Sequence, residues 1–294
     1  MNSSRIWHTE IGSGTPLVMI HGYTVDHRLL LPLEPLFTNH PGWRRLYLDL
    51  PGHGNSPRLS GRTTAASLTG AILDWIAENV GDQRFAVVGQ SFGGQIARAV
   101  TARFGDQVLG SALLAPVVRW GEQRTLPGTT TITADTDLLA ALPDPDRQLF
   151  QMVMAGHTRP NWSLLEQYVL PGWRAHDTDA ATELESEFLL PNWPETSVPP
   201  HRGPHLLITA RQDALVGWRD QLDLLDFYPH MTATVIDGAG HNPQVETAET
   251  VRQSVHHWLR AVESGPIPWP IPEQPAAQPN CAPASNPHRG RIHR

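Results

Sequence analysis

The chain has 294 residues, of which 40% are hydrophobic, and this allows one large α/β domain with an insertion or two small domains. Its formal net charge of −7 argues against a nucleic-acid-binding protein, because polyanions would be repelled overall. All 22 basic residues are Arg, so chemistry that needs a Lys, such as a Schiff base or a phosphate-loop lysine, is excluded.

Cysteine usage and hydropathy narrow the class of protein further. The single cysteine, Cys281, excludes an internal disulfide, and no Cys-x-x-Cys or His-Glu-x-x-His motif supports a zinc site. We therefore expect neither a metal nor an organic cofactor. Residues 1–10 are polar, and no run approaches 18 apolar residues, so we expect a cytoplasmic protein with no membrane span.

Short apolar runs and helical spacings alternate along most of the chain. Strands are predicted at residues 17–20, 45–49, 85–88, 109–114, 205–209 and 231–236, and helices at 65–80, 95–104 and 248–261. Alternating strands and helices indicate right-handed crossovers. The predicted fold class is therefore α/β, with a mostly parallel twisted sheet and helices on both of its faces.

One long segment interrupts this alternation. Residues 117–200 carry four of the ten Trp residues and have helical patterns in places, so we predict that they form an inserted helical cap over a substrate pocket. Residues 1–116 and 201–263 then form the core. Eight of the last 30 residues are Pro, which predicts a disordered tail at 264–294.

Three residues with complementary chemistry follow predicted strands. Ser91, Asp213 and His241 each come just after an apolar run, and groups in these positions of a parallel sheet meet at its carboxyl edge. A serine hydroxyl becomes a nucleophile when a base accepts its proton, and a carboxylate can orient that base.

The sequence around Ser91 predicts a tight turn between a strand and a helix. Gly89-Gln90-Ser91-Phe92-Gly93 fits G-x-S-x-G, in which the two glycines remove side chains that would obstruct the serine. We expect a strained backbone at Ser91. The helix that follows would point free N–H groups and its positive dipole end at the reacting centre.

Five motifs in this order resemble those of the α/β-hydrolase superfamily, in its serine-nucleophile, esterase/lipase-like branch. The resemblance covers about residues 5–262. Its motifs are His21-Gly22-Tyr23, Asp49-Leu50-Pro51-Gly52-His53-Gly54-Asn55-Ser56, Gly89-Gln90-Ser91-Phe92-Gly93-Gly94, Arg211-Gln212-Asp213 and Gly238-Ala239-Gly240-His241-Asn242. The order Ser, Asp, His along the chain is also that of the superfamily.

The resemblance assigns roles to these residues. It implies that Ser91 is the nucleophile, His241 the general base and acid, and Asp213 the group that orients His241. The backbone N–H groups of Tyr23 and Phe92 would form the oxyanion hole.

Other candidates for the acid and the base receive structural roles. Some members of the superfamily take the acid from an earlier strand end, but residues 115–118 include no carboxylate. Asp237 is interpreted as a turn residue. His21 and His53 are expected to brace loops.

The leading hypothesis is a hydrolase of carboxylic esters or lactones that acts through an acyl-enzyme. Epoxide hydrolases and haloalkane dehalogenases of this fold use Asp where this chain has Ser91, so an acyl-enzyme is expected here. Tyr23 replaces a glycine found in another esterase branch and in the carbon–carbon bond hydrolases that the arrangement resembles, and this disfavours the latter. A carbon–carbon bond hydrolase, an acyltransferase or perhydrolase, and a ligand-binding receptor with slow chemistry remain alternatives.

The expected partner is a small, apolar, acyl-containing substrate, and the protein is expected to be a monomer or homodimer without nucleic acid. Cap residues are expected to line the substrate pocket, although each could equally be ordinary core between cap helices. The candidate pocket residues are Gln90, Trp120, Phe150, Met154, Trp162 and Trp173.

Overall fold

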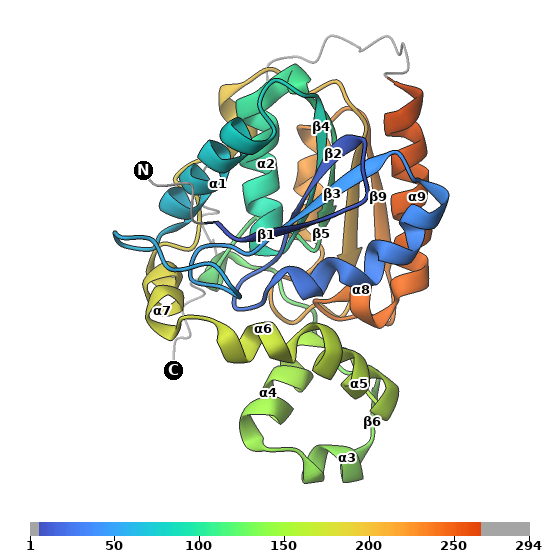
Figure 1. Cartoon of the computed structure of the whole chain (residues 1–294). Helices are drawn as coiled ribbons and strands as arrows, with labels where there is room; N and C mark the ends of the chain where they lie inside the picture. Colours follow the sequence, from blue (N-terminus) through green and yellow to red (C-terminus); the bar gives the residue numbers. More distant parts are fainter. Residues whose placement is uncertain (1–5, 266–294) are drawn as a thin grey trace, which may run out of the picture.

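The computed structural model describes residues 6–265, which are built around a seven-stranded sheet (Figure 1). The strands follow the order β1-β3-β2-β4-β5-β8-β9 across the sheet. Their bounds are β1 (His8–Ile11), β2 (Thr15–Ile20), β3 (Trp43–Leu48), β4 (Phe85–Gln90), β5 (Val108–Leu114), β8 (His205–Ala210) and β9 (Met231–Ile236). Only β1, which the sequence analysis did not predict, pairs antiparallel with its neighbour in this sheet of the described chain. The mostly parallel α/β fold is thereby confirmed.

The central strands are buried on both faces, which explains why they read as continuous apolar runs rather than as alternating patterns. Every residue of β4 and β8 is buried. In β2, Val18 and Ile20 pack into a hydrophobic cluster on one face, and Leu17 and Met19 pack into a second cluster on the other. The sheet therefore forms the middle layer of three.

Helices cover the two faces of the sheet. On one face lie α1 (Ala65–Asn79) and α2 (Phe92–Phe104), and on the other lie α9 (Ala248–Ser264) and a run of 3₁₀ turns, η2 (His27–Asn39) (Figure 1). Pro32 and Pro35 lie inside η2, where they cannot donate backbone hydrogen bonds. The short helix α8 (Pro243–Glu246) precedes α9.

The C-terminal boundary differs slightly from the prediction. Helix α9 continues to Ser264, so the first residue assigned to the tail at 264–294 is helical instead. The apolar stripe of α9, which includes Trp258 and Val262, extends to its end and keeps this last turn packed against the sheet. The rest of the predicted tail, from residue 266 onward, lies outside the described residues.

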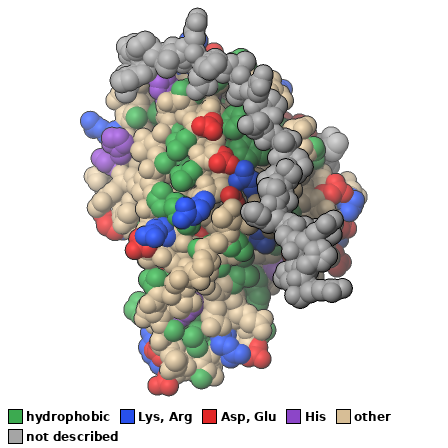
Figure 2. Space-filling model, turned by 180° about the vertical axis from the view of Figure 1, so that it is seen from behind, with side chains coloured by type: hydrophobic (Ala, Val, Ile, Leu, Met, Phe, Trp, Pro, Cys, Tyr) green, Lys and Arg blue, Asp and Glu red, His purple; other side chains and the backbone are tan. Residues whose placement is uncertain are grey.

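The chain between β5 and β8 adds a group of short helices at one end of the sheet. We call residues 117–200 the insertion. It contains α3 (Thr136–Ala141), α4 (Asp144–Val153), α5 (Arg159–Tyr168), α6 (Leu170–Ala175), α7 (Thr178–Ser186) and a two-stranded sheet of β6 (Thr133–Ala134) and β7 (Gly156–His157). In Figure 1, α3, α4 and α5 form a lobe below the sheet, and Figure 2 shows the molecule narrowing at this end. A third hydrophobic cluster fills the lobe, with Leu149, Phe150 and Leu165 among its buried residues.

The surface gives two further observations. Across residues 6–265, no helix combines the length and the apolar content that crossing a bilayer requires. On the face drawn in Figure 2, acidic and basic side chains lie interspersed.

Candidate active site

Ser91 occupies a sharp turn between β4 and α2. Its backbone has φ 53° and ψ −116°, in a region that residues other than Gly rarely adopt. A Cβ on Gly93 would lie 2.3 Å from the carbonyl oxygens of both Ile20 and His21, and one on Gly89 would lie 2.3 Å from the carbonyl oxygen of Gly93. Both glycines are therefore required by close backbone contacts, as the sequence analysis expected.

The structure brings Ser91, His241 and Asp213 into one chain of hydrogen bonds. Ser91 Oγ and His241 Nε2 are 2.8 Å apart, and His241 Nδ1 is 2.8 Å from Asp213 Oδ2. The other oxygen of Asp213 accepts hydrogen bonds from the backbone N–H groups of Leu215 and Val216, and its side chain is fully buried. With the proton of His241 on Nδ1, Nε2 is the acceptor that faces Ser91. Asp237 is largely exposed and accepts a hydrogen bond from Gln212, so it lies outside this chain.

Two backbone N–H groups next to Ser91 have no hydrogen-bond acceptor in the part of the chain that the structure describes. The register pairs Ile20 of β2 with Gly89 of β4, so the loop after β2 runs beside the Ser91 turn. A Cβ on Gly22 would lie 3.1 Å from Ser91 Cβ, which confirms the close approach. Within residues 6–265, neither the N–H of Tyr23 nor that of Phe92 has a hydrogen-bond acceptor. Both donors can therefore bind an anion that develops beside Ser91.

A cavity of about 560 Å³ opens beside Ser91 and His241. The carboxyl edge of the sheet and the insertion both line it. Of the predicted pocket residues, Gln90, Trp120 and Trp173 are among its lining residues.

Three predicted pocket residues lie elsewhere. Phe150, Met154 and Trp162 belong to the hydrophobic cluster of the insertion, and Phe150 and Met154 are almost fully buried in it. The ring of Trp162 contacts Phe150 edge to face, with centroids 5.4 Å apart. These apolar side chains hold the short helices together, which corrects the prediction that they line the pocket.

Gln90 has a second role besides lining the cavity. Its side-chain amide donates to the carbonyl oxygen of His241 at 3.1 Å and to Asn242 Oδ1 at 3.4 Å. The residue before Ser91 thus holds the loop that carries His241. This contact ties the ends of β4 and β9 together.

Glu246, which no sequence motif singled out, joins the His241 loop to the insertion. Its carboxylate accepts hydrogen bonds from the N–H groups of Gly240 (2.7 Å), Gly156 (2.6 Å) and Ala155 (2.9 Å). Burial raises the pKa of Glu246, although these hydrogen bonds partly oppose the increase. The position of Glu246 five residues after His241 was visible in the sequence, but two of its partners lie about 90 positions earlier, Gly156 in β7 and Ala155 just before it.

His21 and His53 brace the loops behind the site. His21 Nε2 accepts the N–H of Leu50 at 2.9 Å, and His53 Nδ1 lies 3.1 Å from the carbonyl oxygen of Pro51. Burial lowers the pKa of His21 to about 4 and that of His53 to about 3. Both rings are therefore neutral near pH 7, as suits the bracing role expected for them.

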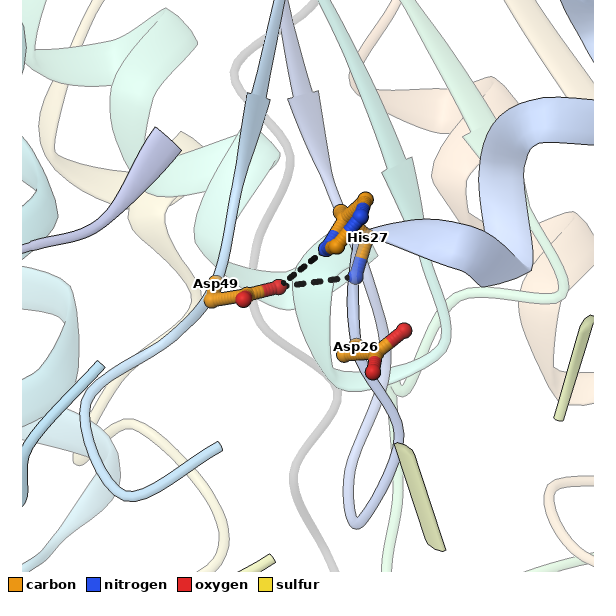
Figure 3. A group of neighbouring side chains, drawn as sticks. All are labelled: Asp26, His27 and Asp49. Atoms are coloured by element: carbon orange, nitrogen blue, oxygen red, sulfur yellow. Dashed lines mark hydrogen bonds and ion pairs between the residues drawn. The ribbon is translucent and has the colours of Figure 1, made fainter. Parts of the chain in front are cut away.

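Asp26, His27 and Asp49 form a cluster of groups that could each offer a metal ligand (Figure 3). Asp49 Oδ1 instead accepts hydrogen bonds from the backbone and the ring of His27, and Oδ2 accepts two from Asn55. Asp26 pairs with Arg28. Burial raises the pKa of Asp49, but the hydrogen bond from His27 and further favourable interactions outweigh it and lower the pKa to about 2. The carboxylates are already satisfied, so the cluster braces the loops after β2 and β3.

Comparison with known proteins supports the fold. A family model described as alpha/beta hydrolase fold matches residues 15–248. The pimeloyl-[acyl-carrier protein] methyl ester esterase of Photobacterium profundum is 24% identical over 266 residues, which cover 88% of this chain and 100% of that protein. The crystal structure of an alpha/beta superfamily hydrolase from Oenococcus oeni PSU-1 superposes with a TM-score of 0.80 and 26% identity, covering 88% of this chain and 97% of that one.

A higher identity over a shorter stretch occurs with a larger protein. The dihydrolipoyllysine-residue acetyltransferase component of the acetoin cleaving system of Cupriavidus necator is 37% identical over 116 residues. That match covers 38% of this chain and only 30% of the relative. Since the family model covers most of the chain, this protein belongs to the alpha/beta hydrolase family.

Proposed function

We propose that the protein is a serine hydrolase that cleaves a carboxylic ester or lactone through an acyl-enzyme on Ser91. The observation that carries this proposal is the hydrogen-bond chain from Ser91 through His241 to Asp213 beside a cavity. An esterase among the full-length relatives supports the ester bond as the target. The cap role of the insertion, and a monomeric or homodimeric cytoplasmic protein, remain predictions.

Acylation begins with proton transfer from Ser91 to His241. As the Ser91 oxygen attacks the ester carbonyl, His241 Nε2 takes its proton, and Asp213 stabilises the imidazolium that forms. The carbonyl oxygen becomes an oxyanion, which the N–H groups of Tyr23 and Phe92 bind. Losing one such donor typically reduces the rate on the order of 100-fold or more.

Acylation ends when His241 gives this proton to the leaving alcohol. In deacylation, His241 takes a proton from a water molecule that attacks the acyl-enzyme, and it returns that proton to Ser91 Oγ as the acid is released. The apolar walls of the cavity, which include Val153, Val169 and Leu215, favour a substrate with an apolar body. Besides the substrate and water, each proposed step uses side chains and backbone groups of this chain.

The decisive test replaces Ser91 by Ala. The Ser91→Ala variant should lose at least about 1000-fold in kcat/KM on short p-nitrophenyl esters, because the nucleophile is removed. Ser163→Ala, on the exposed side of α5, should retain activity. A fluorophosphonate should add one adduct to the wild-type protein and none to Ser91→Ala by intact mass.

Circular dichroism of both variants must match that of the wild type. A folded Ser91→Ala protein that keeps its esterase turnover would remove Ser91 from the mechanism.

A further inference from the structure

An aromatic wall runs from the oxyanion donors to a single arginine in the cavity. The ring of Phe188 lies 5.1 Å from that of Phe92, whose N–H is one of the two donors, and 5.2 Å from that of Tyr23, which carries the other. Trp120 stacks on Phe188 at 4.1 Å with an angle of 26° between the rings. Arg124 Cζ then lies 4.5 Å above the Trp120 ring. Trp120, Phe188 and Arg124 all line the cavity.

The guanidinium of Arg124 is held in place by backbone groups. Nε donates to the carbonyl oxygen of Gly121 at 3.1 Å, and Nη1 donates to that of Leu215. Leu215 lies in the loop after β8, two residues beyond Asp213. Stacking on Trp120 fixes the plane of the group as well. Arg124 is therefore preorganised before any ligand arrives.

The positive charge of Arg124 has no carboxylate partner among residues 6–265. The nearby carboxylates of Asp220 and Asp223 pair with Arg119, and Asp220 also accepts the N–H of Thr125. Nη2 makes no hydrogen bond within the described chain, so it remains able to donate.

The acidic residue among the described residues that line the cavity lies on a different element and is exposed. Glu185 of α7 accepts a hydrogen bond from the hydroxyl of Tyr23 at 3.1 Å. Arg124 is half-buried, where solvent screens a charge less than at the surface. A charge-assisted hydrogen bond to Arg124 is therefore stronger than one to an exposed arginine.

We propose that Arg124 is an anion subsite and that the substrates are esters bearing a carboxylate, separated from the scissile bond by an apolar spacer. This inference rests on the proposed ester hydrolysis at Ser91. The spacer lies along Phe188 and Trp120, and the carboxylate accepts hydrogen bonds from Arg124. A planar guanidinium suits a carboxylate better than an ammonium would. The carboxylate is carried on the acyl side or on the alcohol side of the ester.

The test compares matched neutral and acidic esters in the wild type and in Arg124→Gln. The acyl arm uses p-nitrophenyl hexanoate against mono-p-nitrophenyl adipate, and the alcohol arm uses butyl butyrate against the butyrate ester of 4-hydroxybutyric acid. Arg124→Gln should raise KM for the acidic ester of one arm about 10-fold or more, with neutral esters changed less than about 2-fold. Arg103→Gln, at an exposed site on α2, is the charge-matched control and should leave all four unchanged. The arm that responds identifies which side carries the carboxylate.

A binding measurement separates this inference from the proposed function. Monomethyl adipate and methyl hexanoate are titrated into Ser91→Ala by calorimetry, with and without Arg124→Gln. Monomethyl adipate should bind more tightly than methyl hexanoate, and Arg124→Gln should abolish this preference. That result would support the subsite even if the wild type hydrolysed no ester. Equal effects of Arg124→Gln on acidic and neutral esters, or no preference for the acidic ester in either measurement, would overturn the subsite while leaving hydrolysis at Ser91 intact.

Discussion

The carboxyl edge of the sheet and the insertion line the same cavity, but they are held in position by different interactions. At the sheet edge, glycines and parallel strands place the backbone, and Ser91, Asp213 and His241 are all buried. The insertion consists of short helices of six to ten residues, many of whose side chains are exposed. Polar contacts join it to the core, among them Glu246 to β7 and the buried ion pair of Arg98 with Glu195.

We infer from this difference that the edge of the sheet performs the chemistry and that the insertion controls substrate selectivity. The edge can tolerate little change, because a Cβ added at Gly89 or Gly93 would lie only 2.3 Å from a backbone carbonyl oxygen. The insertion contributes side chains such as Trp120, Arg124 and Trp173 to the cavity. We expect substitution there to change the shape and charge of the cavity while Ser91, Asp213 and His241 keep their positions. The following variants test this contrast in order of decreasing expected effect.

Gly93→Ala tests the backbone contacts of the edge. The added Cβ would overlap two carbonyl oxygens at the end of β2, and we expect the free energy of unfolding to fall by about 3 kcal/mol. Gly70→Ala is the matched control, because no atom lies within 4 Å of its Cβ and it lies inside α1, where Ala is favoured by about 1 kcal/mol. Urea denaturation followed by circular dichroism measures both. Equal effects at the two positions would show that the turn has room to relax.

Glu246→Gln tests the junction between the two regions. The amide keeps one oxygen acceptor but points an NH₂ group toward N–H donors, so the His241 loop loses part of its anchor. We expect kcat to fall about 10-fold with little change in KM, because each 1.4 kcal/mol of lost positioning costs a factor of ten. Glu249→Gln, at a largely exposed side chain on α9, should leave kcat unchanged.

Melting temperatures of the two Glu variants separate positioning from stability. A Glu246→Gln protein that melts earlier but turns over at the wild-type rate would make Glu246 a purely structural residue.

The buried histidines predict how stability depends on pH. The folded state holds the pKa of His21 near 4 and that of His53 near 3, so both rings stay neutral there as the pH falls. In the unfolded chain, the same histidines take up protons below the ordinary histidine pKa of about 6.5. Stability is therefore full above pH 6.5 and falls as the pH decreases toward 4, by up to about 1.4 kcal/mol per pH unit for each histidine.

His53→Gln measures one part of this dependence. Between pH 6.5 and 5, the variant should lose less stability than the wild type, by about 1 kcal/mol per pH unit. His257→Gln, at an exposed position, should keep the wild-type slope. Asp49 does not contribute to this slope. Because its pKa is lowered in the folded state, its contribution to stability is lost only below the ordinary Asp pKa of about 3.8, outside the range from pH 6.5 to 5. Identical slopes for the two variants would contradict the burial of His53 as the cause.

The sequence alone determined the parallel part of the main sheet and the positions of the groups at its edge. Apolar runs predicted every parallel strand of the seven-stranded sheet within a few residues, because a strand buried on both faces has no polar positions to break the run. The glycines around Ser91 predicted its strained turn, since the requirement for a missing side chain is local to the chain.

Only the tertiary structure decided which side chains of the insertion reach the cavity. Trp120 and Trp173 line it whereas Trp162 packs against Phe150, although all three are aromatic residues of the same segment. The roles of Glu246 and Arg124 were equally hidden, because each depends on partners about 90 residues away in sequence. Burial beside a cavity depends on how short helices pack against each other, and an apolar side chain fits either environment.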